Sequence, residues 1–203
     1  YTDRYAEVPF DGMMPKMDIT LYAGYLKSGQ NGEYVFRDGE ATLVAYHRVE
    51  HELTVLYLPE TVDGYPVTGI AAEAFWGEGI ETLYLPASLT HVDPMAFAGM
   101  PELKCIEVRP GSRHFTAKQG ALYTADGKTL VCYPAGRGTV YSMPVGLENI
   151  GAYAFADTKL KAVHLSEGLK QIGEHAFDGT GLTQVTLPHS LTRIGAYAFS
   201  RCR

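Results

Sequence analysis

The chain has 203 residues, with 17 Lys and Arg against 23 Asp and Glu, so its formal net charge is −6. This balance argues against nucleic-acid binding, which needs clustered positive charge. No apolar run reaches the about 20 residues that a transmembrane helix requires, so we expect no transmembrane segment. Because the sequence begins with Tyr1 rather than Met, we expect any signal peptide or anchor to lie outside it.

Residues 1–30 carry no repeat and are interpreted as an N-terminal tail or linker. The alternative is a small packed element that covers the first coil. In residues 31–52, two apolar runs, Tyr34–Phe36 and Ala41–Tyr46, flank Asp38-Gly39. An Asp-Gly pair between such runs indicates a β-hairpin. We expect this hairpin to cap the solenoid, because terminal units must cover an exposed apolar face.

From residue 53 to 203 the chain repeats. The easiest marker is an Ala-Phe pair, which recurs at steps of 22, 58, 22 and 22 residues. The pairs are Ala74-Phe75, Ala96-Phe97, Ala154-Phe155, Ala176-Phe177 and Ala198-Phe199. A fixed period of this length predicts coils that stack and share one core, because no single coil can bury its apolar side chains alone. The five Phe rings are expected to form one continuous stack.

The 58-residue step indicates an insertion. It equals one 22-residue coil plus about 36 residues, and we place the insert at about residues 109–137. Within it, Ala121–Thr124 and Thr129–Tyr133 flank Asp126-Gly127, which predicts a second β-hairpin.

The repeat itself reads Leu-x-x-Val-x-Leu-Pro-x-x-Leu-x-x-Ile-Gly-x-x-Ala-Phe, most clearly from Leu160 to Phe177 and from Leu182 to Phe199. It resembles the BspA-like (treponemal-type) leucine-rich repeat family of bacterial surface proteins, over residues 53–203. Val92-Asp93 and Ala71-Ala72 depart from the pattern. The resemblance implies a secreted or surface-attached protein with a role in adhesion and host contact.

The predicted fold is therefore of the α/β class. We expect a right-handed leucine-rich-repeat solenoid over residues 31–203, rich in strands, with short helices or turns on the other side. A hairpin cap (31–52), the repeats (53–203) and one inserted hairpin complete the prediction.

The third and fifth positions of each repeat strand should point away from the core and form a concave face, because strand side chains alternate. The candidate ligand-binding residues on this face are Tyr57, Tyr84, Thr82, Glu107, His164 and Gln184. Tyr is enriched at recognition surfaces. The alternative is that exposed Tyr is simply a good strand residue.

One string matches a catalytic pattern. His47-Arg-Val-Glu-His51 reads H-x-x-E-H, in which two His on a helix hold zinc and Glu50 acts as general base. The flanking residues alternate like strands, so we interpret the string as a solvated loop and expect no metal, no cofactor and no catalytic residue.

Three cysteines are too few for a disulfide scaffold. Cys105 and Cys132 each take the third place of a strand, so a cross-strand disulfide and two semi-buried thiols both stay open. Cys202 follows the last Ala-Phe pair and is interpreted as structural.

We therefore expect a non-enzymatic binding module that recognises an extracellular protein or glycan. The alternative is a structural spacer or assembly scaffold, and a zinc enzyme at His47, Glu50 and His51 is the remote alternative. Leu182–Leu187 would form an exposed apolar edge strand, which favours weak end-to-end self-association.

Overall fold

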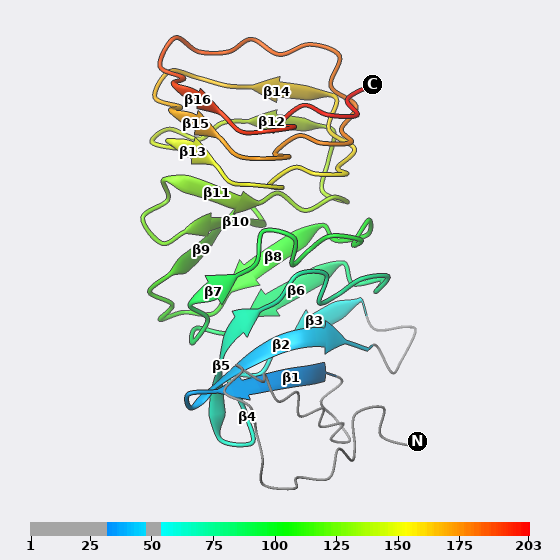
Figure 1. Cartoon of the computed structure of the whole chain (residues 1–203), viewed down its shortest axis with the longest axis vertical. Helices are drawn as coiled ribbons and strands as arrows, with labels where there is room; N and C mark the ends of the chain where they lie inside the picture. The colour runs from blue at the N-terminus through cyan, green and yellow to red at the C-terminus, as the bar shows by residue number, and fades with distance from the viewer. Residues whose placement is uncertain (1–31, 48–53) are drawn as a thin grey trace, which may run out of the picture.

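The computed structural model describes residues 32–47 and 54–203, which form a strand-rich solenoid (Figure 1). The predicted tail, residues 1–30, lies outside these ranges. The strands are β1 (Gly32–Arg37), β2 (Glu40–Tyr46), β3 (Val55–Tyr57), β4 (Thr61–Val62), β5 (Tyr65–Ile70), β6 (Thr82–Leu85), β7 (His91–Val92), β8 (Cys105–Val108), β9 (Phe115–Lys118), β10 (Ala121–Thr124), β11 (Thr129–Cys132), β12 (Val140–Ser142), β13 (Asn149–Ile150), β14 (Ala162–His164), β15 (Gln171–Ile172) and β16 (Arg193–Ile194).

The strands of successive coils pair in parallel on two sides of the solenoid. One side carries the sheet β3-β6-β8 and, beyond it, the two-stranded sheet β12-β14. The other side carries the parallel pair β5-β7 and the parallel run β11-β13-β15-β16. Parallel pairing between coils that are consecutive in sequence is what stacked repeats produce.

Strands β1 and β2 pair antiparallel around Asp38 and Gly39. Both turn residues have positive φ, 52° and 83°, as a type I′ hairpin turn requires. Strand β2 then pairs in parallel with β5, and Ala41 and Leu43 are buried in the core of the first coils. The hairpin is thus continuous with the solenoid, and its role as a cap stays a prediction.

Of the expected short helices or turns, residues 32–47 and 54–203 contain turns and no helix, so the α/β class is corrected to a solenoid of strands and turns. Backbone conformation explains the difference. Tyr153, His175 and Tyr197, which precede the Ala-Phe pairs, have φ of 51–56°, and this left-handed region interrupts an α-helix. The Tyr153 and His175 amides instead bond to the next coil, to the carbonyls of Glu174 and Ala196, each at 3.0 Å.

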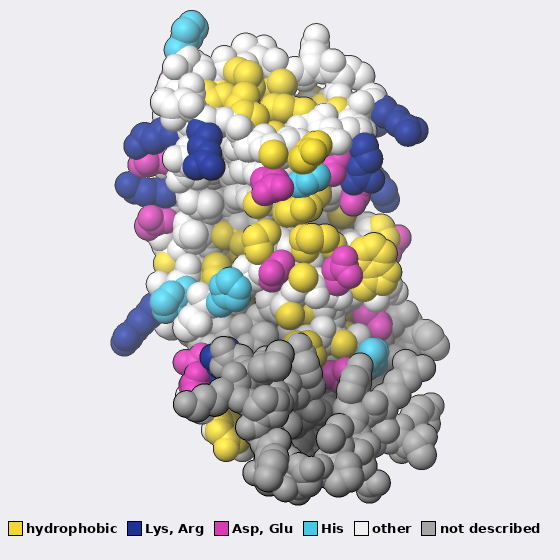
Figure 2. Space-filling view, in the orientation of Figure 1, with side chains coloured by type: hydrophobic (Ala, Val, Ile, Leu, Met, Phe, Trp, Pro, Cys, Tyr) yellow, Lys and Arg dark blue, Asp and Glu magenta, His cyan; other side chains and the backbone are white. Residues whose placement is uncertain are grey.

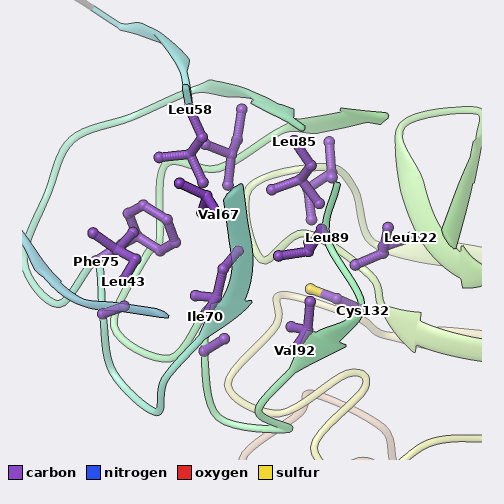
Figure 3. Packing of buried hydrophobic residues seen from close by; sticks show 14 of the residues in the cluster. Leu43, Leu58, Val67, Ile70, Phe75, Leu85, Leu89, Val92, Leu122 and Cys132 are labelled. Carbon is purple, nitrogen blue, oxygen red and sulfur yellow. The ribbon is translucent and has the colours of Figure 1, made fainter. Parts of the chain in front are cut away.

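The buried side chains form two clusters rather than one. The first holds Phe75, and Figure 3 shows Val67, Ile70 and Phe75 pointing into the interior of the coil. The second holds Phe155 and Phe177. Strands β10 and β11 join the two clusters, because Leu122 and Cys132 belong to the first while Tyr123 and Leu130 belong to the second.

The prediction of one continuous Phe stack is therefore wrong. Phe75 stacks on Phe97 at 6.1 Å between ring centroids, and Phe155, Phe177 and Phe199 form a second stack at 4.8 and 5.2 Å. Tyr133, 22 residues before Phe155, lies 5.2 Å from it. The Tyr133 amide donates to the Ala154 carbonyl at 2.8 Å, as the Phe155 amide donates to Ala176.

Cys132-Tyr133 thus takes the place of an Ala-Phe pair. Strand β11 supports this assignment, because Leu130 pairs in parallel with Ile150 in the ladder of the following coils. Part of the region assigned to the insert, namely β11 and Tyr133, therefore belongs to a regular coil of the solenoid. Strands β9 and β10 remain as the antiparallel addition.

The last coil also differs from the prediction. Leu182–Leu187 was expected to form an edge strand, but no strand is present there. Leu182 is buried and Leu187 is exposed. A strand needs a paired neighbour to satisfy its backbone groups, and this segment makes no ladder with β14.

We predict that Phe177→Ala destabilises the protein by about 3–5 kcal/mol, because it opens a cavity in the middle of the second Phe stack, where Phe177 is fully buried. Urea unfolding followed by circular dichroism measures this loss. Phe199→Ala is the matched control and should cost less, because Phe199 is only partly buried. An unchanged urea midpoint for Phe177→Ala would contradict the role of the stack.

Candidate functional site

Four of the six predicted ligand-binding residues lie together on one sheet. Tyr57, Tyr84 and Glu107 occupy matching positions on β3, β6 and β8, and Thr82 precedes Tyr84 by two residues. The Tyr57 and Tyr84 rings stack at 4.3 Å between centroids with 8° between their planes. Tyr57 is 58% exposed. We call these four residues the tyrosine stripe.

The stripe is polar at its Glu107 end. The Cys105 thiol donates to Oε1 of Glu107 at 3.4 Å. The pKa of Tyr84 is raised, first by the neighbouring Tyr57, then by partial desolvation, and more weakly by the negative charge of Glu107. The Tyr84 hydroxyl therefore stays protonated at neutral pH, and a tyrosine hydroxyl can donate a hydrogen bond to a ligand. The stripe offers an aromatic surface, hydroxyl donors and one carboxylate acceptor.

The other two predicted residues lie elsewhere. His164 is exposed on β14, in the separate sheet β12-β14. Gln184 is exposed and belongs to no strand. The structure thus does not bring all six residues into one continuous row, because β9 to β11 lie between the two sheets in the chain and pair with neither.

Sequence reasoning missed a second row of rings. His175 stacks between Tyr153 and Tyr197, at 4.9 and 5.1 Å between centroids. Each of the three residues precedes a repeat Phe by two positions. Their 22-residue spacing is therefore the sequence signal from which this row could have been predicted. Tyr197 ends the row and is 68% exposed.

A charged network fixes this second row. Asp178 accepts hydrogen bonds from Nε and Nη2 of Arg201 at 2.8 and 3.1 Å, and its Oδ2 lies 2.8 Å from Nδ1 of His175. Arg201 also reaches Asp157 at 3.3 Å. The Arg201 guanidinium, followed by His175, holds the pKa of Asp178 below its usual range. The paired charges fasten the last coil to the coil before it.

The zinc hypothesis is tested only in part. Of its three residues, His47 is described, and its Nε2 lies 3.2 Å from Oε1 of Glu33. Glu50 and His51 lie outside the described residues. Within residues 32–47 and 54–203, no group of three or more His, Cys, Asp or Glu is placed to hold a metal. The same ranges contain no helix able to span a membrane.

The repeats match a known protein family. The profile described as BspA type leucine rich repeat region matches in six copies, over residues 51–124 and 138–203. The chain belongs to this family. The match includes β3, β6 and β8, so the tyrosine stripe is built on BspA-type repeats. No protein with a curated description matches the chain.

Two solved structures resemble this BspA-type chain. A leucine-rich repeat protein from Eubacterium ventriosum is 25% identical, with a TM-score of 0.65 over 72% of this chain and 39% of that one. A leucine rich cell surface protein from Faecalibacterium prausnitzii is 21% identical, with a TM-score of 0.51 over 87% of this chain and 52% of that one. The second likeness shows the fold alone. The chain thus spans about two fifths of the length of the first protein and about half of the length of the second.

The cysteines of this BspA-type chain are all free, so the disulfide between Cys105 and Cys132 is not found. Their strands, β8 and β11, belong to different sheets. Burial raises the pKa of Cys132 to about 12. Partial burial and the hydrogen bond to Glu107 raise the pKa of Cys105.

We predict that three thiols react with a disulfide reagent in denaturant at pH 8. In the native protein Cys132 should react roughly a hundredfold more slowly or more, because the thiolate is the reactive form and burial suppresses it. Absorbance of the released thiolate measures both rates, and Cys132→Ser should remove the slow phase. A count of one thiol in denaturant would reveal a disulfide and contradict the prediction.

Proposed function

We propose that this chain is a non-enzymatic binding module of a bacterial protein that is secreted or attached to the cell surface. Membership of the BspA-type family supports this assignment. We further propose that the module recognises an extracellular protein through the tyrosine stripe. The observation that carries the proposal is the parallel stack of Tyr57 and Tyr84 on adjacent coils.

The stack has the properties of a recognition surface. Strand register holds each ring against the other, so binding costs little side-chain entropy. Tyr57 is 58% exposed, and the neighbouring Val55 is 43% exposed on the same strand. Aromatic and aliphatic groups that remain exposed while held rigidly are typical anchors of protein interfaces.

The acidic end of the stripe indicates what the partner carries. Glu107 follows Tyr84 across the strands in the same row. A partner segment that places an apolar side chain on the rings would find a carboxylate acceptor beside them. An Arg or Lys side chain next to an apolar one fits this arrangement, because a charged hydrogen bond to Glu107 is stronger than a neutral one.

We predict that Tyr57→Ala/Tyr84→Ala weakens binding to the partner at least about tenfold, because truncation of aromatic anchors costs more than about 1.4 kcal/mol. Surface plasmon resonance against a panel of matrix proteins, mucins and glycans identifies the partner and measures the change. The purified variants must first show equal melting temperatures.

Tyr65→Ala is the matched control, because Tyr65 is 44% exposed but lies on β5, outside the stripe. A partner bound with unchanged affinity by the double variant would contradict recognition by the stripe. A glycan hit that is lost in the double variant would keep the site and change the class of partner.

The exposed apolar side chain on β16 favours a second candidate function, assembly through the ends of the solenoid. Ile150 and Ile172 are each 1% exposed, whereas Ile194, at the same repeat position, is 46% exposed. Strand β16 is the outer strand of its sheet, and Figure 2 shows hydrophobic side chains gathered at this end of the molecule. We propose a second copy as the occupant, because a two-fold pairing places the same apolar residues on both sides.

We predict that the protein forms dimers whose fraction rises with concentration, since apolar contact drives association. Analytical ultracentrifugation over a concentration series measures the dissociation constant, and Ile194→Lys should abolish the dimer by placing a charge in the contact. Val145→Lys is the control, because Val145 is fully exposed on a turn elsewhere. A monomeric mass at every concentration would exclude this assembly.

A further inference from the structure

Trp76 is the one Trp of the chain, and it is 64% exposed. It directly follows Phe75 of a repeat Ala-Phe pair. The corresponding residues after the other four pairs are Ala98, Ala156, Asp178 and Ser200. The other four repeats therefore fold with a short side chain at this position, so the fold does not require an indole there. A large exposed ring that packing does not demand is a candidate for ligand contact.

The indole lies flat on the backbone of the next coil. A Cβ atom placed on Gly99 would lie only 2.6 and 2.7 Å from Cε3 and Cδ2 of Trp76. The Gly77 amide donates to the Gly99 carbonyl at 3.2 Å, which fixes the two coils at this point. Gly99 thus supports one face of the ring. The opposite face supplies the exposed aromatic surface.

A polar residue begins the turn that carries Trp76. The Trp76 amide donates to the Glu73 carbonyl at 3.0 Å, so the two residues begin and end one tight turn with Cα atoms within about 7 Å. Glu73 is exposed. Within the described residues the indole N–H has no hydrogen-bond acceptor. The turn therefore carries an exposed aromatic ring with an N–H donor and, three residues earlier in the chain, the carboxylate of Glu73.

We propose that Trp76 and Glu73 form a subsite for a neutral pyranose unit of a glycan, on the turn side of the solenoid and apart from the tyrosine stripe. The C–H face of a pyranose ring packs on one aromatic face. Its hydroxyls both donate and accept hydrogen bonds, which matches the carboxylate and the indole N–H. A bound quaternary ammonium group would instead need a cage of aromatic rings, and this turn exposes a single ring.

The experiment uses the fluorescence of Trp76, which reports on this site alone because the chain has no other Trp. The probes are cellotetraose, N-acetylchitotetraose and maltotetraose, with tri-arginine as a cationic comparison. We expect a saturable change in emission with at least one sugar, with a dissociation constant of about 1 mM, which corresponds to about 4 kcal/mol.

Isothermal titration calorimetry measures the variants. Glu73→Gln should weaken sugar binding several-fold, and Trp76→Ala should abolish it. Trp76→Phe keeps a ring but removes the N–H donor, so it should bind with intermediate affinity even if Trp76→Ala folds poorly. Tyr57→Ala/Tyr84→Ala should bind the sugar as the unaltered protein does, which separates this subsite from the tyrosine stripe.

Three results would overturn the proposal. The first is no saturable change with any of the three sugars up to about 20 mM, roughly twentyfold above the expected dissociation constant. The second is a Trp76→Ala variant that binds sugar with unchanged affinity. The third is a saturable response to tri-arginine without any response to the sugars, which would assign the turn to a cationic ligand.

Discussion

The close contact between the backbones of neighbouring coils is the constraint on which the rest of the structure depends. The amides of Gly151, Gly173 and Gly195 donate to the carbonyls of Leu130, Ile150 and Ile172, each at 2.8 Å. The coils approach so closely that a Cβ on Gly173 or Gly195 would lie 2.4 Å from a backbone nitrogen of the preceding coil. Glycine is needed here for space, and neither residue has positive φ. Because these amides donate to carbonyls of the preceding coil, each coil depends on its neighbours for stability.

The same register turns single residues into rows. Equivalent positions on successive coils lie directly beside one another, so rings at matching positions stack on the surface as they do in the core. Tyr57 and Tyr84 form one such pair, and Tyr153, His175 and Tyr197 form another row. A single substitution at a surface position therefore changes both the chemistry of one coil and the contacts of its neighbours. At Trp76 the next coil instead carries a small residue, Gly99, which leaves room for the indole ring.

The repeat spacing predicted the solenoid, and the Asp-Gly pair at residue 38 predicted the turn between β1 and β2, because both signals are local or strictly periodic. Three features could not be predicted in this way. The left-handed conformation of Tyr153 and His175 depends on bonds to the next coil. Cys132-Tyr133 was not recognised as the equivalent of an Ala-Phe pair because it shares no residue type with that pair. Its burial and its distance of 22 residues from Ala154-Phe155 do match those of an Ala-Phe pair. The segment Leu182–Leu187 has the strand pattern but lacks the pairing that makes a strand.

The candidate site shows the same division between local pattern and tertiary placement. Strand alternation predicted one face for Tyr57, Thr82, Tyr84 and Glu107, and the register of β3, β6 and β8 brings these four residues together. It carried no information that His164 and Gln184 would lie outside their sheet. The resulting stripe crosses three strands spaced by about 4.8 Å, so it extends over about 10 Å. A stable protein interface buries about 800 Å² on each partner, which is more than such a stripe offers. The stripe therefore fits the role of a central anchor, and a partner protein must also contact the coils around it.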